Sequence, residues 1–195
     1  MLRIISTGYR AKTAEACKYS VLAQRCSYRF KHIYIEASEL KDDLGPLGNR
    51  DRVIRTLPPD DVVIDLDGDD RLSGDGVLQS IGDDFQDENL WLTWGNFKTT
   101  AGRKSFAGPV GLHPRKEPWR ATHLKCYRAG LWQCLPVQLL LDKHGKFYHW
   151  AGDQAYMLPM LELAGPEHRK FVPEIRYIYN NDSHKHSSYQ HVRRR

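Results

Sequence analysis

Long apolar runs are missing from this sequence of 195 residues, and none approaches the ~18 residues that a membrane-spanning helix needs. The first six residues enter a strand-like run directly, without the apolar core and small-residue cleavage site of a signal peptide. Cysteine is also scarce: the four cysteines form no C-x-x-C pair, and their spacing matches no zinc or haem pattern. We therefore expect a soluble, cytoplasmic protein without membrane insertion and without a disulfide framework.

The composition is that of a folded protein. Hydrophobic residues make up 41% and charged residues 27%, which leaves enough apolar side chain for a core and excludes disordered, collagen-like and coiled-coil classes. The sequence contains no internal repeat, and its length suits one compact domain.

The charges are unevenly distributed along the chain. The formal net charge is +5, but residues 36–88 contain 16 acidic and 5 basic residues, whereas residues 98–128 contain 8 basic residues and one acidic residue. Residues 184–195 add three arginines and one lysine without an acid. An acidic stretch followed by basic ones is typical of a protein that holds a divalent cation and a phosphorylated ligand, although ordinary surface charge gives the same pattern.

The apolar pattern predicts alternating strands and helices. Runs at 2–6, 32–35, 62–64, 90–94 and 171–179 predict strands, and helical spacing at 12–25 and 154–164 predicts helices. Residues 122–135 are a weaker helix candidate, 44–50 and 99–118 have the composition of loops, and 139–150 indicate a hairpin-like excursion. The strand–helix–strand order at the start predicts an α/β fold.

The most informative segment is an acidic cluster that follows the apolar run 62–64. Four carboxylates, those of Asp65, Asp67, Asp69 and Asp70, occupy six positions. Because like charges at this spacing repel, the cluster destabilises the fold unless a cation binds there, and oxygen ligands favour Mg²⁺ or Mn²⁺. An acidic turn that caps the next helix is the alternative interpretation.

Two known acidic motifs match this cluster poorly. An EF-hand loop starting at Asp65 would need Gly at its sixth position and Glu at its twelfth, where this chain has Asp70 and Gly76. A haloacid-dehalogenase-like phosphatase would use Asp65 and Asp67 as nucleophile and acid, but the Thr or Val that follows the glycine in that family is Asp69 here. The phosphatase is kept as a weaker alternative.

The chain resembles the family-2-like glycosyltransferases, which use nucleotide sugars and have the GT-A fold. Residues 62–72 look like the family's strand and Asp-x-Asp-Asp signature (the DXD motif), and Asp153 before a helix looks like its late acidic motif. Further similar segments are residues 4–9, 33–36 and 48–50. The resemblance implies one Rossmann-like GT-A domain over residues 1–180, with a central, mostly parallel sheet flanked by helices, followed by a basic, His-rich tail over 181–195.

The resemblance also implies roles for single residues. Asp67 and Asp69 would hold Mn²⁺ or Mg²⁺ and the donor diphosphate, with His184 or His186 as a further metal ligand, and Asp153 would be the catalytic base. The capping residue of the following helix is the plain alternative for Asp153. The donor, most simply a UDP-sugar, would be bound by the following residues: Thr7, Tyr9, Glu36, Arg50 and Asp67.

The acceptor side is the least defined part of this interpretation. Trp150 is a candidate platform for a sugar ring, and His123 and Arg120 lie in the basic segment that could face the acceptor. A saccharide and a modified base in DNA are both compatible acceptors, since basic surfaces favour polyanions. We expect an inverting, metal-dependent glycosyltransferase; a non-catalytic protein that binds nucleotide sugars or nucleic acid is the rival from another class.

Overall fold

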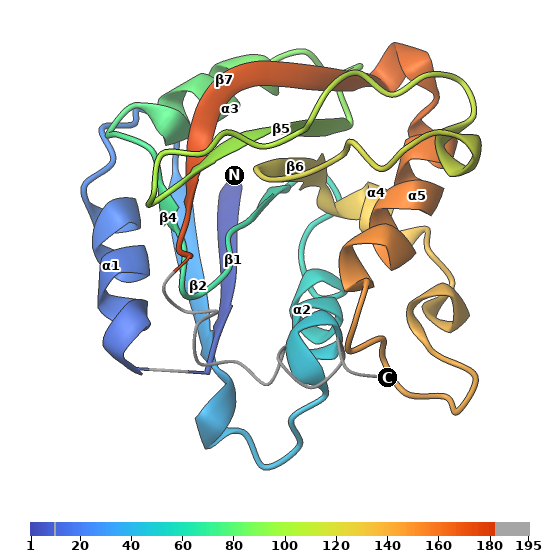
Figure 1. Cartoon of the computed structure of the whole chain (residues 1–195), viewed down its shortest axis with the longest axis horizontal. Coiled ribbons are helices and arrows are strands. Elements are labelled where there is room, and N and C mark those ends of the chain that lie inside the picture. Colours follow the sequence, from blue (N-terminus) through green and yellow to red (C-terminus); the bar gives the residue numbers. More distant parts are fainter. Residues whose placement is uncertain (10, 182–195) are drawn as a thin grey trace.

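The central sheet follows the order β2–β1–β3–β6–β5–β7–β4 (Figure 1). The computed structural model describes residues 1–9 and 11–181, and all seven strands of the sheet lie within them. The strands are β1 (Leu2–Gly8), β2 (Phe30–Glu36), β3 (Val62–Asp65), β4 (Arg71–Leu72), β5 (Leu92–Thr99), β6 (Lys125–Arg128) and β7 (Arg169–Tyr179).

The sheet is mixed but mostly parallel, as the sequence predicts. β1 pairs in parallel with β2 and β3, and β5 pairs in parallel with β7. β6 is antiparallel to both β3 and β5, and β4 is antiparallel to β7. β1, β2, β3, β5 and β7 therefore run in one direction, and β6 and β4 run in the other. The carboxyl ends of β1, β3, β5 and β7 consequently meet the amino end of β6 at one edge.

Helices cover both faces of the sheet (Figure 1). α1 and α3 pack on one face, and α2, α4 and α5 pack on the other. The α-helices are α1 (Ala11–Leu22), α2 (Gly45–Ile54), α3 (Val77–Asp84), α4 (Ala129–Gln133) and α5 (Gly152–Ala164). The 3₁₀ helices are η1 (Ala37–Glu39), η2 (Pro114–Lys116), η3 (Val137–Leu140) and η4 (Pro166–His168).

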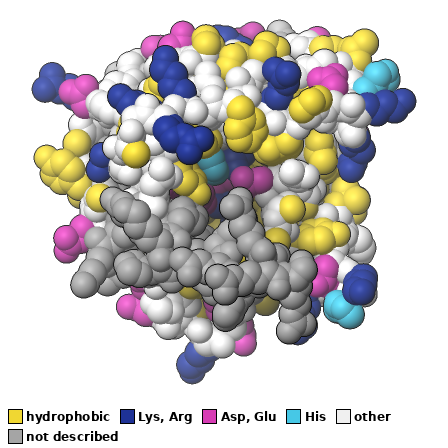
Figure 2. All heavy atoms as spheres, viewed as in Figure 1, with side chains coloured by type: hydrophobic (Ala, Val, Ile, Leu, Met, Phe, Trp, Pro, Cys, Tyr) yellow, Lys and Arg dark blue, Asp and Glu magenta, His cyan; other side chains and the backbone are white. Residues whose placement is uncertain are grey.

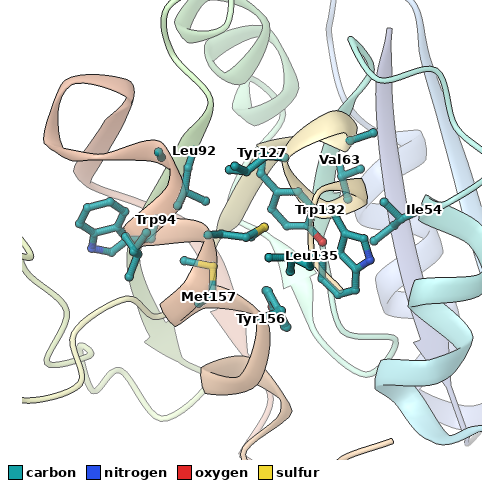
Figure 3. Packing of buried hydrophobic residues seen from close by; sticks show 14 of the residues in the cluster. Ile54, Val63, Leu92, Trp94, Tyr127, Trp132, Leu135, Tyr156 and Met157 are labelled. Atoms are coloured by element: carbon teal, nitrogen blue, oxygen red, sulfur yellow. The ribbon is translucent and has the colours of Figure 1, made fainter. Parts of the chain in front are cut away.

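The alternation of side chains along the strands produces two separate cores. Ile4 of β1 and Ile64 of β3 face α1 and α3, whereas their neighbours Ile5 and Val63 face α2, α4 and α5. The second core is rich in aromatic rings, including Trp132, which packs among the side chains labelled in Figure 3. Such a two-faced arrangement is the architecture expected when a mostly parallel sheet must be buried on both sides.

Two sequence-based expectations are wrong. Residues 44–50 have loop composition, yet Gly45–Ile54 form helix α2, because Pro46 lies in the first helical turn, where a missing N–H costs nothing. The expected helix over 122–135 begins instead as the strand β6, since pairing between β3 and β5 overrides the local helical preference. β4 and α3 were not expected either. The remaining predicted strands and helices are confirmed within a few residues.

The described residues contain neither disulfides nor membrane-spanning helices. The thiols of all four cysteines are free, and Cys17 is fully buried among apolar neighbours, as expected of a small core residue. Within residues 1–9 and 11–181, the helices are too short or too polar to cross a bilayer.

Candidate functional site

The candidate site lies where β1 and β3 end and β6 begins. β3 ends at Asp65, which pairs in register with Ile5 of β1 on one side and with Lys125 of β6 on the other. The acidic cluster therefore follows the strand at the carboxyl edge of the sheet, where α/β proteins commonly bind ligands. The crossing of the antiparallel strand β6 at this point brings a lysine beside the aspartates.

Gly68 fixes the path of the acidic turn against β1. Its amide donates a 3.2 Å hydrogen bond to the carbonyl oxygen of Thr7. A Cβ atom at position 68 would lie 2.6 Å from that oxygen and 2.7 Å from the Cα of Gly8, so only glycine permits this approach. The glycine thereby holds Asp67 and Asp69 at the end of β1.

A buried ion pair forms the inner part of the site. Arg50 Nη2 of α2 lies 2.7 Å from Asp65 Oδ1 as an ion pair, and the same nitrogen donates a 3.2 Å hydrogen bond to Asp67 Oδ1. The hydroxyl of Tyr156 on α5 donates to the other carboxylate oxygen of Asp65. The side chains of Arg50 and Asp65 are only 5% and 2% exposed, so this ion pair is buried beneath the acidic turn.

A second ion pair joins β6 to α5. The Lys125 ammonium donates to Asp153 Oδ1 at 2.8 Å and lies 3.9 Å from Asp65 Oδ2. Lys125 is 1% exposed, whereas the Asp153 side chain is 42% exposed. Asp153 is in the first turn of α5, whose capping position is Ala151, so its carboxylate pairs with Lys125 instead of capping the helix. Asp153 thus presents a carboxylate to solvent while Lys125 holds one of its oxygens in place.

Burial and neighbouring charges shift the pKa values of both Asp153 and His123. Burial raises the pKa of Asp153, but the charges of Lys125 and then His123 outweigh it and hold the pKa well below its usual range. Burial and the neighbouring Lys125 lower the pKa of His123, whose Nε2 lies 4.0 Å from Asp153 Oδ2. The His123 ring stacks on Tyr177 at 4.6 Å, and its Nδ1 is buried without a hydrogen-bond partner among the described residues.

The outer part of the site contains the remaining aspartates. The hydroxyl of Tyr177 on β7 donates to Asp70 and lies 3.3 Å from Asp67 Oδ2. Burial, followed by repulsion from Asp67 and Asp69, raises the pKa of Asp70 to about 8. The crowding expected from the sequence is therefore real, and Asp67 and Asp69 are the half-buried members that face outward.

The donor set suits a hard divalent cation only in part. Asp67 and Asp69 supply carboxylate oxygens, the ligand type that Mg²⁺ and Mn²⁺ prefer. Among residues 1–9 and 11–181, however, no group of three or more His, Cys, Asp or Glu side chains is arranged to hold a metal. A cation at this turn would therefore take further ligands from substrate phosphates or water, as Mg²⁺ commonly does. The other predicted ligands, His184 and His186, lie outside the described residues.

A cleft of about 580 Å³ opens beside Asp153. Figure 2 shows acidic and histidine side chains deep in this face of the molecule, with Lys and Arg side chains nearby. The side chains that line the cleft come from the end of β5, the segment after it, the start of β6, α5 and the end of β7: Phe97, Thr99, Arg103, Lys104, Ser105, Phe106, Trp119, Thr122, His123, Asp153, Tyr179 and Asn181. His123 thus lines the same cleft as Asp153.

Three of the residues predicted to bind the nucleotide-sugar donor, Thr7, Tyr9 and Glu36, lie around the ends of β1 and β2. Thr7 is 8% exposed and its hydroxyl has no hydrogen-bond partner among the described residues. Tyr9 is 44% exposed and donates to Asp43 at 3.2 Å, and Glu36 ends β2. Arg50, which is also predicted to bind the nucleotide-sugar donor, contacts Asp65 and Asp67 through Nη2, and its Nε has no hydrogen-bond partner among the described residues.

The predicted acceptor residues separate in the structure. Trp150 is 55% exposed and lines a different cavity of about 390 Å³ with Tyr148 and Gln154. Arg120 is exposed next to Trp119 and packs over Gly108. Only His123 of these three lines the cleft that contains Asp153.

Sequence reasoning missed the groups that link the aspartates. Lys125 falls in a segment expected to be helical, and Tyr156 and Tyr177 lie in a predicted helix and a predicted strand without any local acidic partner in the cluster. Each contacts a partner at least 28 positions away in the sequence. The nearest pair in sequence is Lys125 with Asp153, and the most distant is Tyr177 with Asp70. No local pattern marks such pairs; the position of a lysine and two tyrosines in otherwise apolar segments is the only signal.

Comparison with known proteins identifies the fold. No protein-family model and no curated protein sequence matches the chain. It is similar to TarS, a glycosyltransferase of S. aureus: 92% of this chain aligns with 36% of TarS at a TM-score of 0.64 and 16% identity. The TarS 1–349 structures in complex with UDP and with UDP-GlcNAc give TM-scores of 0.63 and 0.59 at 13% identity, with 60% and 58% of those chains covered. The chain therefore spans between about one third and three fifths of these proteins and has the α/β fold found in the glycosyltransferase TarS.

Proposed function

We propose that this protein is a glycosyltransferase that moves a sugar from a nucleotide donor, most simply a UDP-sugar, to an acceptor hydroxyl with inversion. The observation that carries the proposal is the convergence of two acidic groups, the Asp67–Asp69 turn and Asp153, on one edge of the sheet. The fold of TarS, which has been crystallised with UDP and UDP-GlcNAc, supports the choice of donor.

The residues divide the reaction between them. Asp153 would accept the proton of the acceptor hydroxyl while the oxygen of that hydroxyl forms a bond to the anomeric carbon. The bond from that carbon to the donor phosphate breaks on the opposite face, and its electron pair leaves with the nucleoside diphosphate. Mn²⁺ or Mg²⁺ held by Asp67 and Asp69 would screen the charge of this leaving group. Lys125 would hold Asp153 in place.

The phosphatase alternative has less support. A haloacid-dehalogenase-like mechanism would need Asp65 as an accessible nucleophile. The Asp65 side chain is 2% exposed and is surrounded by Arg50, Lys125 and Tyr156, so a phosphate ester cannot reach it in this arrangement.

Substitution of Asp69 tests the proposed metal and donor site. Asp69→Ala should abolish the release of UDP from a UDP-sugar in the presence of Mn²⁺, with an unchanged circular dichroism spectrum, because no hydrogen bond or ion pair of the described residues involves the Asp69 carboxylate. Asp60→Ala is the matched control: Asp60 is exposed and precedes β3, whereas Asp69 follows it. Equal turnover in the two variants would remove the metal and donor assignment.

Substitution of Asp153 separates a catalyst from a binding protein. Asp153→Asn should retain the dissociation constant for the UDP-sugar and lower turnover by about 10²–10⁴-fold, the contribution typical of a general base. Wild-type protein that binds the donor and never turns it over would instead favour the non-catalytic protein.

A further inference from the structure

The cleft beside Asp153 carries two cations that the proposed reaction does not use. Arg103 and Lys104 line it and are exposed, and no carboxylate of the described residues pairs with either side chain. The aromatic side chains of Phe106 and Trp119 line the same cleft, and Phe106 is 67% exposed. A neutral saccharide would use the rings but leave both cations without a partner.

The segment that holds these cations is hydrogen-bonded to the sheet. The amide of Thr99 at the end of β5 donates to the Arg103 carbonyl at 2.8 Å, and the Arg103 amide donates to the Thr99 hydroxyl at 3.0 Å. The Ser105 amide donates to the Phe97 carbonyl at 3.0 Å, and its hydroxyl donates to Asn96 at 2.8 Å. Arg103 and Lys104 are therefore held at the cleft by a fixed turn.

Basic side chains continue beyond the cleft. Lys98 on β5 and Arg120 beside Trp119 are exposed and form no ion pair within residues 1–9 and 11–181. One bound phosphate needs only one or two cations, whereas a series of cations along a surface matches a strand with repeated phosphates. Phe106 and Trp119 supply aromatic rings to the same cleft, and nucleobases stack on such rings.

We infer that the acceptor is a nucleic-acid strand, one nucleotide of which enters this cleft with its phosphates on Arg103 and Lys104 and its base against Phe106 and Trp119. The inference rests on the proposed transferase function, because Asp153 at the cleft would accept the proton of the nucleotide's hydroxyl. Enzymes that modify a base in a duplex must first take it out of the stack, and a single strand avoids that cost.

The chemistry restricts which nucleotide can serve. An RNA strand would offer its ribose 2′-hydroxyl, whereas internal residues of unmodified DNA have no free hydroxyl, so in a DNA strand the accepting oxygen must belong to a hydroxylated base such as a hydroxymethyl-pyrimidine. That oxygen would form a bond to the anomeric carbon, its proton would pass to Asp153, and the nucleoside diphosphate would leave with the electron pair of the broken bond. For a DNA acceptor, a base hydroxylation or hydroxymethylation reaction must therefore precede this enzyme.

Binding of a short fluorescein-labelled single strand with one hydroxymethyl-pyrimidine, measured by anisotropy over a salt series, tests the inference. Arg103→Ala/Lys104→Ala should weaken binding and reduce the slope of log K against log salt by about 1.4, since each phosphate contact on a single strand contributes about 0.7. The matched control is Arg29→Ala/Lys31→Ala, which also removes one arginine and one lysine. Both are exposed and flank the start of β2, and their loss should leave the slope unchanged.

A second variant distinguishes nucleic acid from other phosphate polymers. Phe106→Ala should weaken oligonucleotide binding about tenfold by loss of stacking and leave the binding of inorganic polyphosphate unchanged. Equal slopes in the two double variants would overturn the inference, as would a Phe106→Ala variant that binds both polymers as the wild type does. Binding of UDP with Mn²⁺, measured on the same preparations, distinguishes failure of this inference from failure of the proposed function.

Discussion

Lys125 is the residue that connects the two acidic parts of the site. Its ammonium is buried, lies 2.8 Å from Asp153 and 3.9 Å from Asp65, and is within 5.4 Å of the Tyr156 ring centre. A buried lysine is retained only with partners for its charge. Lys125 holds Oδ1 of the Asp153 carboxylate, and Oδ2 lies on the side of His123 and the cleft. The positive charge of Lys125 also lowers the pKa of Asp153.

Removal of the Lys125 charge should change the pH dependence of turnover. A base acts when deprotonated, so the acid limb of the rate profile follows the Asp153 pKa, which Lys125 holds below its usual range. Lys125→Met should move that limb upward by about 1–3 pH units, the effect of one neighbouring opposite charge. Lys125→Arg keeps the charge and should leave the limb in place. An acid limb at the same pH in the Met variant would contradict the role of Lys125.

The individual aspartates were predictable from the sequence, and their partners were not. Asp67 and Asp69 are recognisable because four carboxylates crowd into six positions after an apolar run, which is local information. Lys125 and Tyr177 reach this cluster only because β6 and β7 belong to the same sheet. Those pairings depend on the packing of the whole chain, so no short window of sequence contains them.

At the scale of secondary-structure elements, the acidic turn depends on its contact with β1. The turn follows β3, and Gly68 lets its backbone approach Thr7 and Gly8 more closely than any side chain would permit. The sequence indicates a turn here from its glycine and aspartates, but the required proximity to β1 becomes apparent only with the parallel pairing of β1 and β3.

Substitution of this glycine should destabilise the protein. Gly68→Ala would place a Cβ atom 2.6 Å from the Thr7 carbonyl oxygen, and a displaced backbone should lower the free energy of unfolding by about 1–3 kcal/mol. Gly76→Ala is the control, because a Cβ atom there meets no atom within 4 Å and should change the free energy by less than about 1 kcal/mol. Urea unfolding of both variants measures the difference, and equal midpoints would contradict the close packing of the turn.

The errors at the element scale have a common cause. α2 contains two glycines and a proline in its first half and reads as a loop, but it packs Leu47 and Ile54 into the second core and directs Arg50 at Asp65. β6 has residues that also suit a helix, but it completes the sheet between β3 and β5. In both segments tertiary packing overrides a weak local preference.

At the scale of the whole molecule, the uneven charge along the sequence acquires a structural meaning. The acidic stretch 36–88 supplies Asp65 and Asp67, and the basic stretch 98–128 supplies Lys125, Arg103 and Lys104. The fold brings the two stretches together at one edge of the sheet. The α/β class followed from the strand–helix–strand order, whereas this juxtaposition required the antiparallel insertion of β6.

The most direct test of the proposed function is thermal unfolding of the whole protein with UDP, with and without Mn²⁺. A nucleotide at about 100 times its dissociation constant should add about 2.7 kcal/mol of stability, which raises the Tm of a chain of this size by roughly 5–11 °C. We expect this shift with UDP and Mn²⁺ together, a smaller one with UDP and a chelator, and its loss in Asp69→Ala. A Tm that UDP and other nucleoside diphosphates leave unchanged in the presence of Mn²⁺ would contradict the assignment of a nucleotide-sugar site.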